Sequence, residues 1–120
     1  MLKNFARRLA IGCITLITPW FLLCAPVMAL NLSSVDHGAQ VFSVHCAGCH
    51  VNGGNIVRRG KNLKLKTLQR HHIDSLEAIG EIVANGRGIM SAYGDRLSEQ
   101  EITDVSAYVL QQAEQGWKNK

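Results

Sequence analysis

The pentapeptide from Cys46 to His50, Cys-Ala-Gly-Cys-His, constrains the fold of this chain more than any other feature. C-x-x-C-H is the attachment motif of a c-type haem, in which both thiols form thioethers with the macrocycle. The histidine directly follows the second thiol, on Cys49, so it comes to lie beneath the iron as the proximal ligand. A chain with this motif is expected to fold around a flat apolar cofactor.

Two other kinds of site use closely spaced cysteines, and both fit this chain less well. A dithiol redox centre is expected within a βαβ pattern, which the sequence around Cys46 and Cys49 lacks. A zinc site needs a second pair of Cys or His residues at ligand spacing, and the sequence shows none. We therefore predict one covalently bound haem c as the cofactor.

Residues 1–29 have the pattern of a secretory signal peptide. Basic residues stand at positions 3, 7 and 8, residues 9–23 are largely apolar, and a small-residue run ends at Ala29. A retained membrane anchor is the alternative, but the apolar stretch is shorter than the roughly 20 residues that span a bilayer. We predict cleavage after Ala29, export, and one cytochrome-sized domain over residues 30–120 without a membrane span.

Cleavage would change the composition in two ways. Met90 would become the only methionine, and Cys46 and Cys49 the only cysteines, because the other residues of these types lie before residue 30. The whole chain carries 13 basic and 9 acidic residues, and the three basic residues of the signal segment account for most of that excess. The remaining domain is nearly neutral, so no affinity for nucleic acid is expected.

The rest of the chain predicts helices separated by glycine-containing loops, with no alternating strand of useful length. We expect helices over residues 34–46, 63–69, 75–84 and 98–116. The last is the best defined, because Ser98 and Glu101 form a capping box, and Asp74 is the expected cap of the third. The apolar positions are Val35, Ala39, Phe42 and Cys46 in the first helix and Ile102, Val105, Tyr108 or Val109, and Ala113 in the last. About 90 residues in four short helices have only a marginal core, so an all-α fold around the haem is predicted.

The second axial position of the iron separates electron carriers from haem proteins that bind external ligands. Met90 is the leading candidate, because it lies in the glycine-rich segment 85–94, which can fold over the other haem face. A thioether is a soft donor that favours Fe(II) and raises the reduction potential. The alternative role for Met90 is to fill a gap in the packing.

Four further histidines compete for the same position. His71 and His72 could give a bis-His iron of lower potential, although a place on the surface of the second helix is the expected one. His37 and His45 belong to the helix that presents the cysteines. They therefore lie on the proximal side and cannot easily reach the opposite haem face.

Several segments together resemble the class I cytochromes c, and within that class the cytochrome c6 family of cyanobacterial and algal thylakoid lumens. The segments are Gly38-x-x-x-Phe42-x-x-x-Cys46 and residues 53–57, 85–90, 94–97, 107–110 and 116–117. The resemblance implies a class I cytochrome c fold of about four short helices around one covalently attached haem. It also implies a close crossing of the terminal helices at Gly38 against Tyr108. The haem-binding residues it implies are Cys46, Cys49, His50 and Met90, of which His50 and Met90 bind the iron.

The same resemblance implies a soluble, monomeric protein that carries one electron and is not an enzyme. Its expected partners are membrane redox complexes met transiently, with a cytochrome b6f-like donor and photosystem I or an oxidase-like complex as acceptor. The expected location is the thylakoid lumen or the periplasm. A haem-based sensor or ligand-binding module with a labile sixth site is the alternative function.

Two departures from the family pattern concern the segment around Met90 and the reduction potential of the haem. Ser91 follows Met90 where proline is usual, and a proline would restrain that loop. Ile82 stands eight residues before the methionine, where glutamine is usual. An aliphatic side chain near the haem is expected to change the reduction potential. The resemblance to c6-like paralogues with aliphatic residues there implies a lower value, and the alternative is that Ile82 only packs in its helix. These differences indicate a c6-like paralogue and leave its donor and acceptor open.

Basic residues gather between positions 51 and 72, where six Lys or Arg and no acid are found. They are Arg58, Arg59, Lys61, Lys64, Lys66 and Arg70. We predict that this segment presents a basic side to an acidic partner, with a solvated charged face as the alternative. Arg87, in the ligand loop, could contact a partner or a haem propionate. The apolar rim contacts expected at the exposed haem edge are Ile56, Val57 and Ile89.

Overall fold

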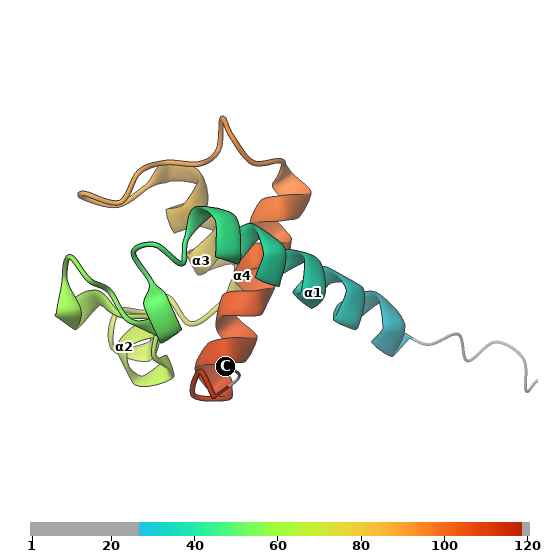
Figure 1. Cartoon of the computed structure of the whole chain (residues 1–120), viewed down its shortest axis with the longest axis horizontal. Helices are drawn as coiled ribbons and strands as arrows, with labels where there is room; N and C mark the ends of the chain where they lie inside the picture. The colour runs from blue at the N-terminus through green and yellow to red at the C-terminus, as the bar shows by residue number, and fades with distance from the viewer. Residues whose placement is uncertain (1–26, 119–120) are drawn as a thin grey trace, which may run out of the picture.

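The computed structural model describes residues 27–118, which form four α-helices and two short 3-10 helices (Figure 1). In chain order they are α1 (Val27–His45), η1 (Val51–Gly53), η2 (Arg59–Lys61), α2 (Leu65–Arg70), α3 (Leu76–Asn85) and α4 (Glu99–Glu114). Within residues 27–118 the only β-type pairing is an isolated bridge between Arg87 and Met90. The predicted all-α fold with four helices is confirmed.

The start of α1 differs from the prediction. The sequence predicts a helix from residue 34, whereas α1 begins at Val27. The predicted signal peptide lies outside the described residues as far as position 26, and its cleavage point after Ala29 falls in the first turn of α1. Cleavage therefore stays a prediction. Across the described part of the chain, no helix has both the length and the apolar character needed to cross a membrane.

The two longest helices cross closely, and a glycine makes the crossing possible. α1 packs against α4, and α3 packs against α4 as well (Figure 1). A Cβ atom on Gly38 would collide with the carbonyl oxygen of Asp104 and lie 3.0 Å from Cβ of Tyr108. Because only glycine lacks that atom, the predicted crossing at Gly38 against Tyr108 is confirmed.

A polar contact closes the same crossing. Nδ1 of His37 lies 2.7 Å from Oδ2 of Asp104, and Nε2 of Gln100 donates to Oδ1 at 2.8 Å. Asp104 is buried, so these partners offset the cost of removing its carboxylate from water. His37 therefore joins α1 to α4 and serves the fold.

All four α-helices contribute to one apolar core. Its buried members are Val41, Phe42, Leu68, Ile79, Val83, Leu97, Val105, Val109 and Ala113. The apolar stripe predicted for α4 is confirmed, whereas the one predicted for α1 is only partly right. Phe42 is buried, but Val35 and Ala39 are half-buried, and the neighbouring Val41 takes a core position instead.

The helix caps test two predictions from the sequence. In α4 the Ser98 hydroxyl accepts from the Glu101 amide at 3.2 Å, and the Ser98 amide donates to Oε2 of Glu101 at 2.8 Å. The capping box is confirmed. The Ser98 amide and hydroxyl both donate to the Glu101 carboxylate, and these two hydrogen bonds hold its pKa below the ordinary value. The prediction that Asp74 caps α3 is wrong. Ser75 caps that helix, because its extended backbone places the hydroxyl 3.2 Å from the Ala78 amide.

Trp117, beyond the end of α4, anchors the loop that follows the cysteine motif. Its indole nitrogen donates to the carbonyl oxygen of Leu63 at 3.0 Å, and its ring centroid lies 5.3 Å from that of Phe42. A Cβ atom on Gly53 would collide with the indole. The C-terminal aromatic ring thus holds the loop over residues 53–63 against α1.

Candidate haem site

A cavity of about 400 Å³ opens among the end of α1, the loop after it, α2, α3, the segment before α4, and α4 itself. This volume lies within the range of about 300–1,000 Å³ that is typical of ligand pockets. The apolar part of its lining consists of Phe42, Val57, Leu63, Leu68, Ile73, Ile79, Ile82, Val83, Ile89, Val105 and Val109. The predicted site residues Cys46, Cys49, His50 and Met90 all line it too. The fold therefore brings together two segments that lie far apart in the sequence.

The cysteine motif continues α1 as a tight turn. The amides of Cys49 and His50 donate to the carbonyl oxygen of Cys46 at 3.1 and 2.9 Å. In this turn Cys46 is half-buried and Cys49 is exposed, and both carry free thiols. We call residues 46–54 the attachment segment, because it presents both thiols to the same cavity.

The ring of His50 is oriented by the end of the attachment segment. Its Nδ1 lies 2.9 Å from the carbonyl oxygen of Gly54. A carbonyl can only accept a hydrogen bond, so Nδ1 must carry the proton. The lone pair of a neutral ring then lies on Nε2, which is the arrangement that a metal-binding histidine needs.

The thiol of Cys46 lacks the lowered pKa that is typical of a dithiol redox centre. Burial, with a smaller contribution from Cys49, raises its pKa to about 11. Redox-active C-x-x-C motifs instead lower the pKa of the attacking thiol. Over residues 27–118 there is also no cluster of three or more His, Cys, Asp or Glu side chains able to hold a metal. The dithiol and zinc alternatives therefore find no support in the geometry.

Met90 lies in a tight turn that two glycines permit. The Arg87 amide donates to the carbonyl oxygen of Met90 at 3.1 Å, and the Met90 amide donates back to Arg87 at 3.2 Å. Gly86 and Gly88, at φ +71° and +63°, adopt left-handed backbone that glycine accommodates without strain. A Cβ atom on Gly86 would lie 2.6 Å from the Met90 carbonyl oxygen. We call residues 86–97 the ligand loop.

Tyr93 is the functional residue that sequence reasoning missed. Its hydroxyl donates to the carbonyl oxygen of His45 at 3.1 Å, and its amide donates to that of Val83 at 2.9 Å. The guanidinium of Arg96 covers the ring at 4.4 Å from the centroid. These contacts tie the ligand loop to α1 and α3, although Ser91 lacks the restraint of a proline. The one sequence signal was an aromatic residue three positions after the methionine.

The histidines are distributed between the cavity and the surface. His71, which ends α2, is half-buried and lines the cavity, with Nζ of Lys61 at 3.3 Å from its Nε2. His72 is exposed and does not line this cavity. His45 lines it from the end of α1.

Comparison with known proteins agrees with this geometry. Residues 33–109 match the family model described as cytochrome c oxidase, cbb3-type, subunit III. The chain is 59% identical to a cytochrome c6-like protein of Nostoc sp. (strain PCC 7120 / SAG 25.82 / UTEX 2576), over 88% of this chain and 95% of that protein. It is 55% identical to the crystal structure of cytochrome c6B from Synechococcus sp. WH8102, with a TM-score of 0.67 over 70% of this chain and 96% of that one. It is 60% identical to the crystal structure of cytochrome c6C from Synechococcus sp. PCC 7002, with a TM-score of 0.66 over 67% of this chain and 98% of that one.

The fold, the cavity and these matches define a class I cytochrome c with one covalently bound haem c and its iron. The lining fits that group, because two free thiols, an oriented imidazole and a thioether border an otherwise largely apolar space. Within this class the chain belongs to the cytochrome c6 family. It is an electron carrier of the c6-like kind.

Proposed function

We propose that this protein carries single electrons between membrane redox complexes, with its haem attached to Cys46 and Cys49 and its iron held by His50 and Met90. One observation carries the proposal. These four side chains, from the attachment segment and the ligand loop, line the same apolar cavity. When bound, the haem supplies an iron centre that gains or loses one electron without forming a bond to a substrate.

The chain's own residues prepare that site for electron transfer. His50, held by Gly54, keeps its Nε2 available as a ligand. Tyr93 and the paired backbone of Arg87 and Met90 hold the thioether in place. The apolar lining excludes water, so that the axial ligands and the surrounding side chains set the potential. A thioether ligand favours the reduced iron and raises the potential, whereas the aliphatic Ile82 beside the cavity lowers it.

An exposed apolar rim supports transient docking at the cavity mouth. Ile56, Val57 and Ile89 are all exposed, and the last two also line the cavity. Weak redox encounters use small interfaces, and a few apolar contacts near the cofactor suit such an encounter. A cytochrome b6f-like donor and photosystem I or an oxidase-like acceptor are the partners we propose.

Spectroelectrochemical titration of the purified holoprotein tests this function. We expect one reversible one-electron transition and a low-spin His–Met spectrum in both oxidation states. A bis-His spectrum would exclude Met90 as ligand. Rapid binding of carbon monoxide to the reduced protein would favour the sensor alternative, which the tied ligand loop opposes.

Export is tested separately by the mass and N-terminal sequence of the protein purified from its host. We propose that residues 1–29 are removed and that the mature protein acts in the thylakoid lumen or the periplasm. The expected N-terminus is Leu30. A mature protein that begins at Met1 would contradict cleavage and leave the electron-carrier function untouched.

A further inference from the structure

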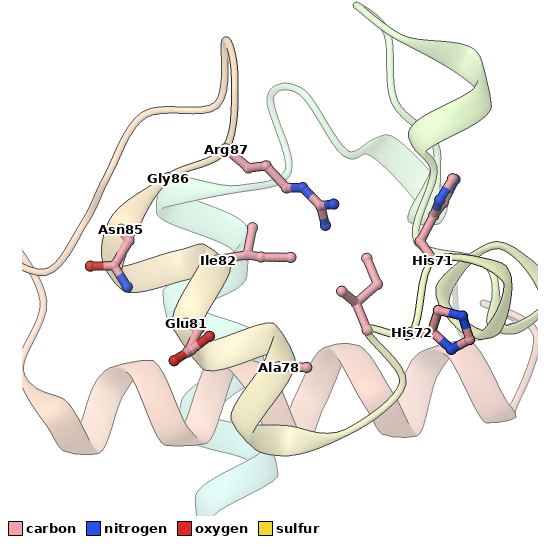
Figure 2. A pocket seen from close by; sticks show the side chains of 9 residues that line it. His71, His72, Ala78, Glu81, Ile82, Asn85, Gly86 and Arg87 are labelled. Atoms are coloured by element: carbon pink, nitrogen blue, oxygen red, sulfur yellow. The ribbon is translucent and has the colours of Figure 1, made fainter.

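A second hollow lies beside the haem cavity. It is a groove of about 410 Å³ between α3 and the segment that follows α2 (Figure 2). Its lining consists of His71, His72, Ile73, Ala78, Glu81, Ile82, Asn85, Gly86 and Arg87. Four of these residues, His71, Ile73, Ile82 and Arg87, also line the haem cavity. The groove therefore adjoins the haem cavity and shares part of its lining.

A guanidinium group reaches into this groove. Figure 2 shows the Arg87 side chain extending past Ile82 toward the wall that carries His71 and His72. Arg87 is exposed, so the groove is open to a molecule from outside. Its planar fork of N–H donors matches a carboxylate in a bidentate geometry.

The charges around the groove favour an anionic occupant. Nζ of Lys61 lies beside the His71 ring, which forms part of the wall. The sequence from residue 51 to 72 contains no acid, and Asp74 and Glu77, which follow it, do not line the groove. Glu81 is the one acidic residue of the lining, and Figure 2 places its carboxylate on the side of α3 remote from the two histidines.

Arg87 also connects the groove to the iron ligand. Its backbone exchanges two hydrogen bonds with Met90, at 3.1 and 3.2 Å. A group that holds the Arg87 side chain in the groove therefore also restrains the turn that carries Met90. Binding in the groove and the strength of the iron–sulfur bond are expected to depend on each other.

We propose that this groove receives a carboxylate side chain from an acidic surface of the redox partner, which pairs with Arg87 between Ile82 and the two histidines. The inference rests on the proposed function, since it names the kind of partner that docks beside that haem. It adds to the apolar rim a charged contact that fixes the orientation of the partner.

The test is titration of the reduced, ¹⁵N-labelled holoprotein with a ten-residue poly-L-glutamate peptide at low ionic strength. We expect amide shifts to concentrate at residues 71–73 and 78–87 and to vanish at high salt. Arg87→Gln should weaken binding about tenfold or more, because it removes a charged hydrogen-bonding partner. Lys118→Gln is the matched control. It removes one exposed positive charge that lies outside the basic segment 51–72 and outside both linings, and should weaken binding no more than about twofold.

Two results would overturn the proposal. An equal loss of peptide affinity in the two variants would mean that the peptide responds only to the overall positive charge of the protein. Complete displacement of the peptide by inorganic phosphate at the same concentration of charge would mean that the groove binds any small anion and does not recognise a carboxylate side chain.

A second readout is the displacement of Met90 by imidazole in the oxidised protein, which we expect to slow several-fold when the peptide is bound. Unchanged displacement would refute the link between the groove and the iron ligand. The His–Met spectrum of the same sample reports on the proposed function independently. A normal His–Met spectrum in a protein that does not bind the peptide would contradict only this inference and leave the proposed function intact.

Discussion

The attachment segment and the ligand loop hold the two ends of one haem site by different means. In the attachment segment the hydrogen bonds of the cysteine turn join residues close in sequence, as between His50 and Gly54 or between Cys46 and His50, and the longest joins Gly53 to Leu63, ten positions on. In the ligand loop the Tyr93 hydroxyl reaches His45, 48 positions away. The first is a local motif that the sequence shows directly, whereas the second exists only once the helices have packed.

The largest effect is expected from removing both thiols. The double variant Cys46→Ser, Cys49→Ser should carry no covalent haem, and without the cofactor its small core should fail to hold the helices together. Haem staining after denaturing electrophoresis and far-ultraviolet circular dichroism measure the two losses. The single variant Cys49→Ser is the control and should retain one thioether. A haem-free chain that still unfolded cooperatively would show that the haem is dispensable for the fold.

The next effect concerns the sixth ligand. Met90→Ala should keep the haem and the fold but lower the reduction potential by roughly 0.2 V, a quarter of the range of about 0.8 V that axial ligands cover. The neighbouring change Ser91→Ala should leave the potential nearly unchanged. Both are measured by spectroelectrochemistry. An unaltered potential in the Met90 variant would point to another ligand, with His71 as the residue in the cavity wall.

A smaller effect tests whether the ligand loop needs its glycine. Gly86→Ala places a side chain at φ +71° and against the Met90 carbonyl oxygen. The free energy of unfolding should fall by roughly 2–4 kcal/mol, with partial loss of the His–Met spectrum. Gly60→Ala is the matched control, because nothing lies within 4 Å of its Cβ position. Equal denaturant midpoints for the two variants would be inconsistent with a tightly packed turn.

The smallest effect addresses the long-range contact itself. Tyr93→Phe keeps the ring but removes the hydrogen bond to His45, so the free energy of unfolding should fall by about 0.5–1 kcal/mol. Imidazole should then displace Met90 about two- to fivefold faster. Tyr108→Phe, in the aromatic contact with Phe42, is the control and should leave displacement unchanged. Identical displacement rates in both variants would mean that the ligand loop does not depend on Tyr93.

Sequence reasoning was most successful where short-range chemistry decides the structure. The capping box of Ser98 and Glu101 is present because both partners lie within one helical turn. The sequence predicts Asp74 as the cap of α3 because its carboxylate can accept a hydrogen bond from a helix amide. Ser75 takes that role instead, because its extended backbone precedes the first helical residue. Two adjacent capping residues cannot be ranked without knowing where the helix begins.

In the candidate site, too, short-range patterns were predicted and long-range contacts were not. The sequence predicted Cys46, Cys49, His50 and Met90 as site residues, and the structure places all four in the lining of one cavity. It did not reveal the contact of Tyr93, nor the groove around Arg87, because both depend on how α1, α2 and α3 approach one another.

By itself, the sequence predicted a haem attached at Cys46 and Cys49, a helical chain, and a close crossing of the terminal helices at Gly38. The first two follow from residue types at fixed short spacings, whereas the crossing at Gly38 was implied by the resemblance to the class I cytochromes c. Only the tertiary structure decided that His37 pairs with Asp104 across 67 positions, that Tyr93 ties the ligand loop to α1, and that Arg87 borders two hollows at once. The physical reason is that these contacts join side chains whose distance is set by helix packing, which no local pattern encodes.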